Sequence, residues 1–318
     1  MYMITLEVEG RRPIFGHLVG DPFAERGSSD EPRIVLSVLG KAVQSEWLAI
    51  HDHYPQIEVM AVQMMPDHMH GILFVKEPLP LHLGQVMTGF KAGCRKAQRA
   101  LKAIAAAKPQ HTENGMQVSP YATASPSPCV TPPYRPLFAK GYNDLILRSF
   151  DELPVWKNYL RDNPRRLLMK RARPEWLRPF FDFRIGTHTY SGIGNRQLLA
   201  TPKRVAVRVS RRLNDSEIVA VTARYIEEAQ QGTILVSPAI SPGEKKVMRT
   251  AFDAGLPIIV IMENGFTPLS KPHGEQFDAC ARGRLLMLAP WEHHNEKKKI
   301  TAEQCSQMNL MALEICKH

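Results

Sequence analysis

Two histidines stand one residue apart at the head of an apolar run, in the stretch PDHMHGILFV at residues 66–75. A second apolar run, residues 57–62, precedes it, so we predict one strand over residues 57–75 with a bend near Pro66. Side chains two apart on a strand share a face, which places His68 and His70 side by side and turns Met69 into a core. Two imidazoles at this spacing form half of a metal site.

The first 185 residues alternate between strand-like and helix-like patterns. A helix predicted at 151–171 contains Pro164, and because proline bends or breaks a helix, we expect its first half to end near Asn163. The order of elements predicts an α+β domain whose antiparallel sheet is covered by helices on one side. Besides residues 57–75, the predicted elements are strands at 5–9 and 12–19 forming a hairpin, helices at 33–51 and 81–107, and a strand region at 137–148.

The rest of the chain divides differently. Residues 107–136 are rich in proline, serine and threonine and lack periodicity, so we predict an insertion without regular structure. Residues 186–202 are rich in glycine, serine and threonine, which is typical of an interdomain linker. Strand and helix patterns then alternate regularly over residues 203–318, which predicts a second, Rossmann-like α/β domain with a parallel sheet.

Charge and composition narrow the class of protein. The net charge of +10 indicates a polyanionic partner such as nucleic acid. The five cysteines are scattered without Cys-x-x-Cys spacing, which argues against a disulfide framework and a structural zinc site. No apolar run approaches the roughly 20 residues that span a bilayer. The N-terminus also lacks a signal-peptide pattern, so we expect a cytoplasmic protein with no membrane partner.

The helix at 151–171 adds the residues that make the histidine pair chemically interesting. Tyr159 and Asn163 are four apart, so they share one helical face. That face offers a phenol and an amide oxygen to a metal held by the histidines. A divalent cation there could polarise a phosphodiester while a tyrosine attacks it.

Three stretches in this order, PDHMHGILFV, GYNDLILR and WKNYLRDNPRR, resemble the single-tyrosine HUH transposases, in particular the REP-associated tyrosine transposases. The resemblance covers most of residues 1–185. It implies that His68, His70 and Asn163 bind Mg²⁺ or Mn²⁺ and that Tyr159 is the nucleophile. It further implies cleavage and rejoining of single-stranded or hairpin DNA through a 5′-phosphotyrosine intermediate, a ferredoxin-like sheet and a homodimer.

Basic residues gather around the same helix. Nine lysines and arginines lie between Lys157 and Arg184, and three carboxylates oppose them. Such a cluster is suited to holding a phosphate backbone. We predict DNA contacts from the basic residues of this helix and of the basic stripe on the helix at 81–107, namely Arg161, Arg165, Arg166, Lys170, Lys91 and Arg95.

Two rival functions remain open at this stage. One is a nickase of the replication-initiator or relaxase type, which shares the chemistry but acts on other targets. The other is a DNA-binding protein that recognises hairpins without cleaving them. The second domain faintly resembles the Rossmann-like domain of the DprA family. Its stretch from Val236 to Glu244 joins a strand end to a helix start, the position at which parallel sheets bind anions.

Overall fold

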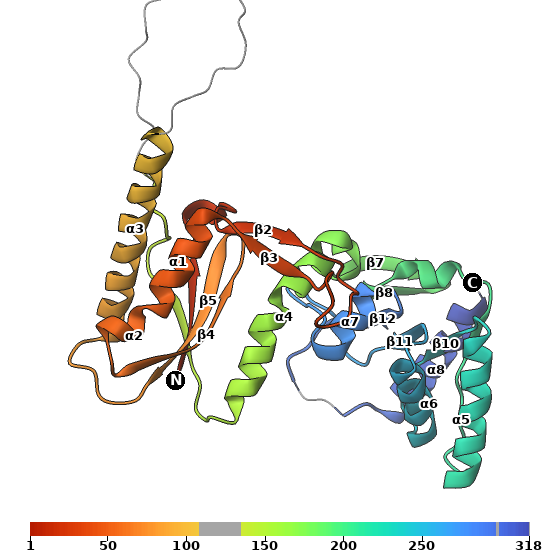
Figure 1. The fold of residues 1–318 in the computed structure, drawn as a ribbon. Coiled ribbons are helices and arrows are strands. Elements are labelled where there is room, and N and C mark those ends of the chain that lie inside the picture. Colours follow the sequence, from red (N-terminus) through yellow and green to blue (C-terminus); the bar gives the residue numbers. More distant parts are fainter. Residues whose placement is uncertain (108–134, 297–298, 318) are drawn as a thin grey trace, which may run out of the picture. The chain divides into compact units, whose positions relative to one another are not determined.

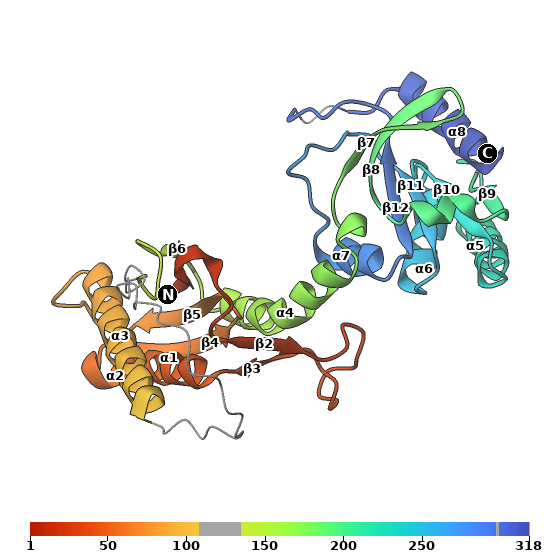
Figure 2. The same cartoon turned by 90° about the horizontal axis from the view of Figure 1, so that it is seen from above.

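The computed structural model describes residues 1–107, 135–296 and 299–317 (Figures 1 and 2). The predicted insertion at 107–136 therefore falls almost wholly outside the described residues. The chain forms two compact units, Met1–Leu168 and Met169–His318.

The first unit contains the predicted antiparallel sheet. Its four strands follow the order β4-β5-β1-β6, with β1 at Tyr2–Glu7, β4 at Ile57–Met64, β5 at His68–Val75 and β6 at Asn143–Ile146. The helices are α1 at Val38–Leu48, α2 at Ile50–His53, α3 at Leu83–Ala107 and α4 at Glu152–Ala172. A ribbon of β2 at Gly16–Val19 and β3 at Arg33–Leu36 stands apart from the sheet.

Both faces of this sheet are covered. Ile4 and Leu6 of β1 and Met69 of β5 are buried in one cluster with Trp47 of α1 and Phe90 of α3. On the other face, Ile72 is buried with Leu153 and Leu160 of α4. The prediction of helices on one side thus holds for α1 and α3, whereas α4 lies on the opposite face.

Three details of the first unit differ from the sequence prediction. Residues 57–75 form two antiparallel strands rather than one bent strand, because the chain reverses between Met64 and His68. The segment 12–19 does not pair with β1; its β2 pairs with β3, which the prediction had placed in a helix. Ile34, Leu36 and Val38 fit strand and helix spacing alike, and the helix begins only where Ser37 caps it by accepting a hydrogen bond from the Gly40 amide.

Pro164 does not end α4. The helix runs on to Ala172, so the expected break near Asn163 is wrong. Proline removes one backbone hydrogen bond from a helix, but packing can offset that loss. Here Leu160, before the proline, and Met169, after it, are each buried in a hydrophobic core.

The second unit carries a six-stranded mixed sheet in the order β7-β8-β12-β11-β10-β9. Strands β9 to β12 are parallel, as predicted, and β8 joins β12 in antiparallel orientation. The strands are β7 at Phe180–Ile185, β8 at His188–Gly194, β9 at Arg204–Ala206, β10 at Ile234–Ser237, β11 at Ile258–Ile261 and β12 at Leu285–Ala289. The helices are α5 at Asp215–Gln230, α6 at Pro242–Asp253, α7 at Gly274–Ala281 and α8 at Ala302–Lys317.

The predicted domain limits need correction. Residues 186–202 are not a linker, because β8 lies inside the six-stranded sheet, and residues 180–185 form the edge strand of that sheet rather than part of the first domain. The glycines that suggested a linker serve close packing instead. A Cβ on Gly192 would lie 2.6 Å from the Met287 carbonyl oxygen, and one on Gly194 would lie 2.2 Å from that of Leu285.

Gly71, directly after the histidine pair, is held by a similar constraint. A Cβ built on it would lie 2.1 Å from the ring of Trp47, which is fully buried. We expect Gly71→Ala to lower the free energy of unfolding of the first unit by about 2 kcal/mol, because neither the indole nor the strand can move freely. Urea denaturation measures the loss. Gly89→Ala is the control, since its methyl would meet only the Tyr54 hydroxyl at 3.2 Å; equal losses in both variants would contradict the packing argument.

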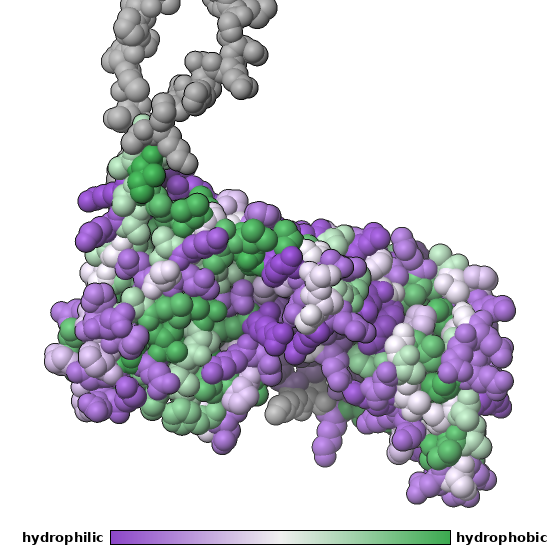
Figure 3. All heavy atoms as spheres, viewed as in Figure 1, coloured by the Kyte–Doolittle hydropathy of each residue, from purple (hydrophilic) through white to green (hydrophobic). Residues whose placement is uncertain are grey.

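No described helix is both long and apolar enough to cross a membrane. The face drawn in Figure 3 carries both hydrophilic and hydrophobic side chains.

Candidate active site

The histidine pair lies on one face of β5. Met69 and Leu73 belong to the core under α1 and α3, whereas Ile72 belongs to the core under α4. Because side chains alternate along a strand, His68 and His70 share the face of Ile72. Their ring centroids are 4.9 Å apart and the ring planes meet at 87°. The two imidazoles are therefore neighbours, as predicted, but perpendicular.

Each histidine is fixed through its Nδ1 atom. His70 Nδ1 lies 2.8 Å from the hydroxyl oxygen of Thr5, its register partner on β1. His68 Nδ1 lies 2.6 Å from Oδ1 of Asp67, the residue directly before it in the chain. A carboxylate can only accept, so His68 donates from Nδ1, and the neutral form of the ring then has its lone pair on Nε2. Neither Nε2 atom has a hydrogen-bond partner among the residues that the structure describes. This is the arrangement that metal-binding histidines use.

His70 is held neutral at physiological pH. Burial, with smaller contributions from the charges of the nearby His68 and Arg11, lowers its pKa from 6.5 to about 4. A neutral ring keeps a lone pair for a metal ion.

The depressed pKa of His70 makes stability depend on pH. The unfolded chain takes up this proton near pH 6.5, whereas the folded unit takes it up only near 4. The unfolded state binds more protons between these values, so lowering the pH through this window should reduce the free energy of unfolding by up to roughly 3 kcal/mol. Urea denaturation in the presence of a chelator measures this slope. His70→Gln should flatten it, and an unchanged slope in that variant would contradict the assignment.

Helix α4, which carries Tyr159 and Asn163, packs on the sheet face that carries the histidines. Leu153 and Leu160 of α4 pack with Ile72, which lies two residues beyond His70 on β5. Tyr159 is 44% exposed, and its ring meets that of Trp156 edge-on at 5.6 Å. Asn163 has a buried Nδ2 atom without a hydrogen-bond partner. A buried polar atom without a partner in the chain is available to a bound ligand or a water molecule.

These residues fit a divalent cation. The donors are the two Nε2 atoms and the amide of Asn163, whose oxygen and nitrogen can exchange places by a flip of the side chain. The described residues contain no group of three or more His, Cys, Asp and Glu side chains placed to hold a metal. The amide oxygen of Asn163 is the third ligand that the resemblance to the HUH transposases implies. Imidazole with oxygen donors suits Mn²⁺ and, less well, Mg²⁺.

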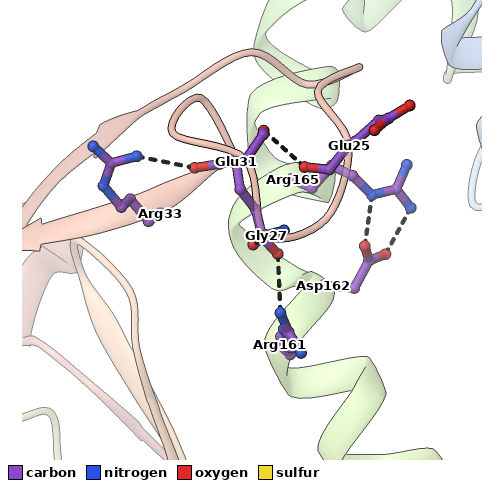
Figure 4. A network of polar contacts seen from close by, with 8 residues as sticks. Glu25, Gly27, Glu31, Arg33, Arg161, Asp162 and Arg165 are labelled. Atoms are coloured by element: carbon purple, nitrogen blue, oxygen red, sulfur yellow. Dashed lines mark hydrogen bonds and ion pairs between the residues drawn. The ribbon is translucent and has the colours of Figure 1, made fainter.

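Two of the predicted DNA contacts of α4, Arg161 and Arg165, are already paired with carboxylates (Figure 4). Arg161 Nη2 lies 3.5 Å from Glu31 Oε1, in the loop between β2 and β3. Arg165 donates two hydrogen bonds, of 2.6 and 2.9 Å, to the carboxylate of Asp162. Arg166 also lies in the first unit and has an interaction of its own. Phosphate would have to share or displace these partners.

Two other predicted DNA contacts, Lys170 and Lys91, also have partners within the chain, and their contact with DNA stays a prediction. Lys170 belongs to the second unit, where its ammonium lies 6.0 Å from the centre of the Phe277 ring. Lys91 donates hydrogen bonds to the carbonyl oxygens of Ala139 and Gly141, at 2.9 and 2.5 Å, and so braces the chain before β6. Arg95 remains a candidate and lines a surface hollow of about 460 Å³ with Lys96 and Arg99.

The second unit has a basic cavity at the carboxyl ends of β9 and β10. It measures about 470 Å³ and is lined by Arg208, Ser210 and Arg211, with Ser241 at the start of α6. At the helix start predicted as an anion site, several backbone amides already have acceptors within the chain. The Ser241 hydroxyl accepts from the Glu244 amide, and the Glu244 carboxylate accepts from the amides of Ile240 and Ser241. Any anion here would rely on the arginines.

Comparisons with known proteins are sparse. No family model matches the chain. An uncharacterised protein of Haemophilus influenzae is 27% identical over 112 residues, covering 29% of this chain and 56% of that protein. The solved structure of DNA processing protein A from Helicobacter pylori, described for its single-stranded DNA binding mode, aligns with a TM-score of 0.30 and 16% identity over 40% of this chain and 56% of that one. The chain thus spans about half the length of each. The transposase resemblance and the homodimer it implies stay predictions from the sequence motifs.

Proposed function

We propose that this chain binds single-stranded DNA and that its first unit cleaves and rejoins the strand through Tyr159. The observation that carries the proposal is the histidine pair on one sheet face, with both rings held at Nδ1 and both Nε2 atoms unpartnered, under a helix that carries Asn163 with a buried, unpartnered Nδ2 atom. The resemblance of the surrounding motifs to the single-tyrosine HUH transposases supports the same chemistry.

The chemistry assigns one role to each residue. The phenol oxygen of Tyr159 attacks the phosphorus, the bond from phosphorus to the 3′ oxygen breaks, and that oxygen leaves as a 3′-hydroxyl after gaining a proton. The product is a 5′-phosphotyrosine, which the same or another 3′-hydroxyl can attack to rejoin DNA, so no external energy source is needed. A divalent cation bound by His68, His70 and Asn163 would supply polarisation of the phosphodiester and charge stabilisation. Thr5 and Asp67 keep the imidazoles oriented.

The second unit would add affinity rather than chemistry. Arg208 and Arg211 are exposed beside its basic cavity and form no ion pair within the described part of the chain. Exposed cations around a cavity are suited to DNA phosphates.

The proposal is tested by incubating the full chain with labelled single-stranded hairpins and with matched duplexes, with Mn²⁺ or with a chelator. Cleavage of single strands alone, dependent on metal and accompanied by a protein-linked fragment, supports it. Tight binding of hairpins without cleavage across metals would favour the non-cleaving rival. Site-specific nicking of one origin-like sequence would favour the replication-initiator type.

The carboxylate of Glu31 is paired with Arg161, which we predict to contact a DNA phosphate. Because the carboxylate and the phosphate compete for the same guanidinium, Glu31 should weaken DNA binding. The ion pair between Arg161 and Glu31 is exposed, and exposed ion pairs contribute at most about 1 kcal/mol to stability. A DNA phosphate can therefore replace the Glu31 carboxylate at little cost in free energy. We expect Glu31→Gln to raise affinity for single-stranded DNA about threefold, measured by fluorescence anisotropy at low salt. Glu58→Gln, an exposed change on β4, is the control. A loss of affinity in Glu31→Gln, or an equal gain in both variants, would refute the assignment.

A further inference from the structure

Arg11 stands beside the histidine pair in an unusual backbone conformation. It ends the short 3-10 turn at Glu9–Arg11, directly after β1, with a φ of 53°. Non-glycine residues seldom adopt this region, and within the described residues only Asp182 and Ala239 do so besides Arg11. Backbone strain of this kind often persists where a side chain has a function.

The guanidinium of Arg11 is connected to the proposed metal ligand His68 through one residue, Asp67. Its Nη1 atom is 3.0 Å from Oε1 of Glu7, and its Nε atom is 3.3 Å from Oδ2 of Asp67. The other oxygen of Asp67 holds His68.

The net charge around the histidine pair determines whether a phosphodiester is attracted to it. Glu7 and Asp67 each carry one negative charge, and imidazoles that ligate a metal ion are neutral. With a divalent cation bound, the cluster has one net positive charge in the presence of Arg11 and none in its absence. A phosphodiester carries one negative charge, so Arg11 makes the centre attractive to it rather than neutral.

We propose that the guanidinium of Arg11 contacts a non-bridging oxygen of the phosphodiester held at His68 and His70. The inference rests on the proposed function and adds a substrate contact to it. The side chain is 51% exposed, so DNA can reach it. Two carboxylates hold it on one side, and an arginine fork has donors left for a phosphate oxygen.

A different role would give a different signature. If Arg11 served only to hold Asp67, and through it His68, its loss would loosen a metal ligand and weaken metal binding about 10-fold or more. If Arg11 contacts phosphate, its loss removes a positive charge near the metal and leaves metal affinity unchanged or higher.

The experiment compares Arg11→Gln with wild type in the full chain. Mn²⁺ affinity is measured by electron paramagnetic resonance, and binding of a labelled oligothymidylate of about 30 nucleotides by anisotropy over a series of salt concentrations, with Mn²⁺ and with chelator. We expect Mn²⁺ affinity within about threefold of wild type, oligothymidylate affinity lowered about 10-fold at low salt, and a salt slope smaller by about 0.7.

The control is Arg12→Gln, which removes the same charge one residue on. The Arg12 side chain donates to the carbonyl oxygens of Glu9 and Pro136, so its loss should leave the salt slope unchanged. Arg11→Gly relieves the backbone strain and should unfold as cooperatively as wild type while showing the same DNA defect.

Several outcomes would overturn the proposal. They are weakened Mn²⁺ binding with an unchanged salt slope, oligothymidylate binding equal to wild type, and an equal defect in Arg12→Gln. If wild type itself fails to bind single-stranded DNA, the proposed function fails. If wild type binds and Arg11→Gln binds equally well, only the role of Arg11 fails.

Discussion

Replacing Tyr159 with phenylalanine is expected to abolish the covalent protein–DNA adduct, with a loss of at least about a thousandfold in its rate of formation. The substitution removes the attacking oxygen and keeps the ring, so no other group can form the 5′-phosphotyrosine. Binding of single-stranded DNA should stay within about threefold of wild type, because the ring contact with Trp156 is preserved. Denaturing gels measure the adduct and anisotropy measures binding.

The matched control is Tyr142→Phe, in the segment before β6 of the same unit. It also loses one phenol hydroxyl, and it should form the adduct at close to the wild-type rate. An adduct that persists in Tyr159→Phe would rule out Tyr159 as the nucleophile, and loss of the adduct in both variants would point to a general effect on the fold.

Removing the histidine rings should have the second large effect. We expect His68→Ala and His70→Ala each to weaken Mn²⁺ binding about 100-fold or more, because each deletes one of two imidazole donors. Thr5→Val should have a smaller effect, about 10-fold, since it removes only the partner of His70 Nδ1. Isothermal titration calorimetry gives all three affinities.

This graded series has its own control. His17 lies on β2, in the two-stranded ribbon outside the four-stranded sheet, and His17→Ala should bind Mn²⁺ as wild type does. Equal Mn²⁺ affinity in His70→Ala and wild type would remove the basis for a metal site on β5.

The sequence was most informative where the pattern is local. Spacing of two on a strand placed His68 and His70 on one face, and spacing of four placed Tyr159 and Asn163 on one helix. The alternation beyond residue 203 predicted four parallel strands and the helices between them. These inferences need no knowledge of distant partners, because they follow from the geometry of a single element.

Errors arose where an element depends on residues far along the chain. The strand at 33–36 forms because β2 offers it a partner, and the glycines of β8 allow close approach to residues 285–287, about a hundred positions later. Composition alone made the same glycines look like a linker. Pro164 is tolerated because residues on either side of it are buried in cores that the helical pattern does not reveal.

The candidate site shows the same division. Thr5 and Arg11 were not predicted, because their proximity to the histidines comes from the pairing of β1 with β5. Glu31 was missed for a similar reason: 130 positions separate it from Arg161. An apolar strand pairing with the His-x-His strand is the signal that could have directed attention to Thr5.

The most direct test of the account is to identify the protein residue that becomes joined to DNA. Wild-type protein would be incubated with single-stranded hairpins and Mn²⁺, digested with nuclease and protease, and analysed by tandem mass spectrometry. We expect a nucleotide linked through its 5′-phosphate to the peptide containing Tyr159, and none when a chelator is present. A nucleotide on another residue, or DNA cleaved without any linked peptide, would contradict it.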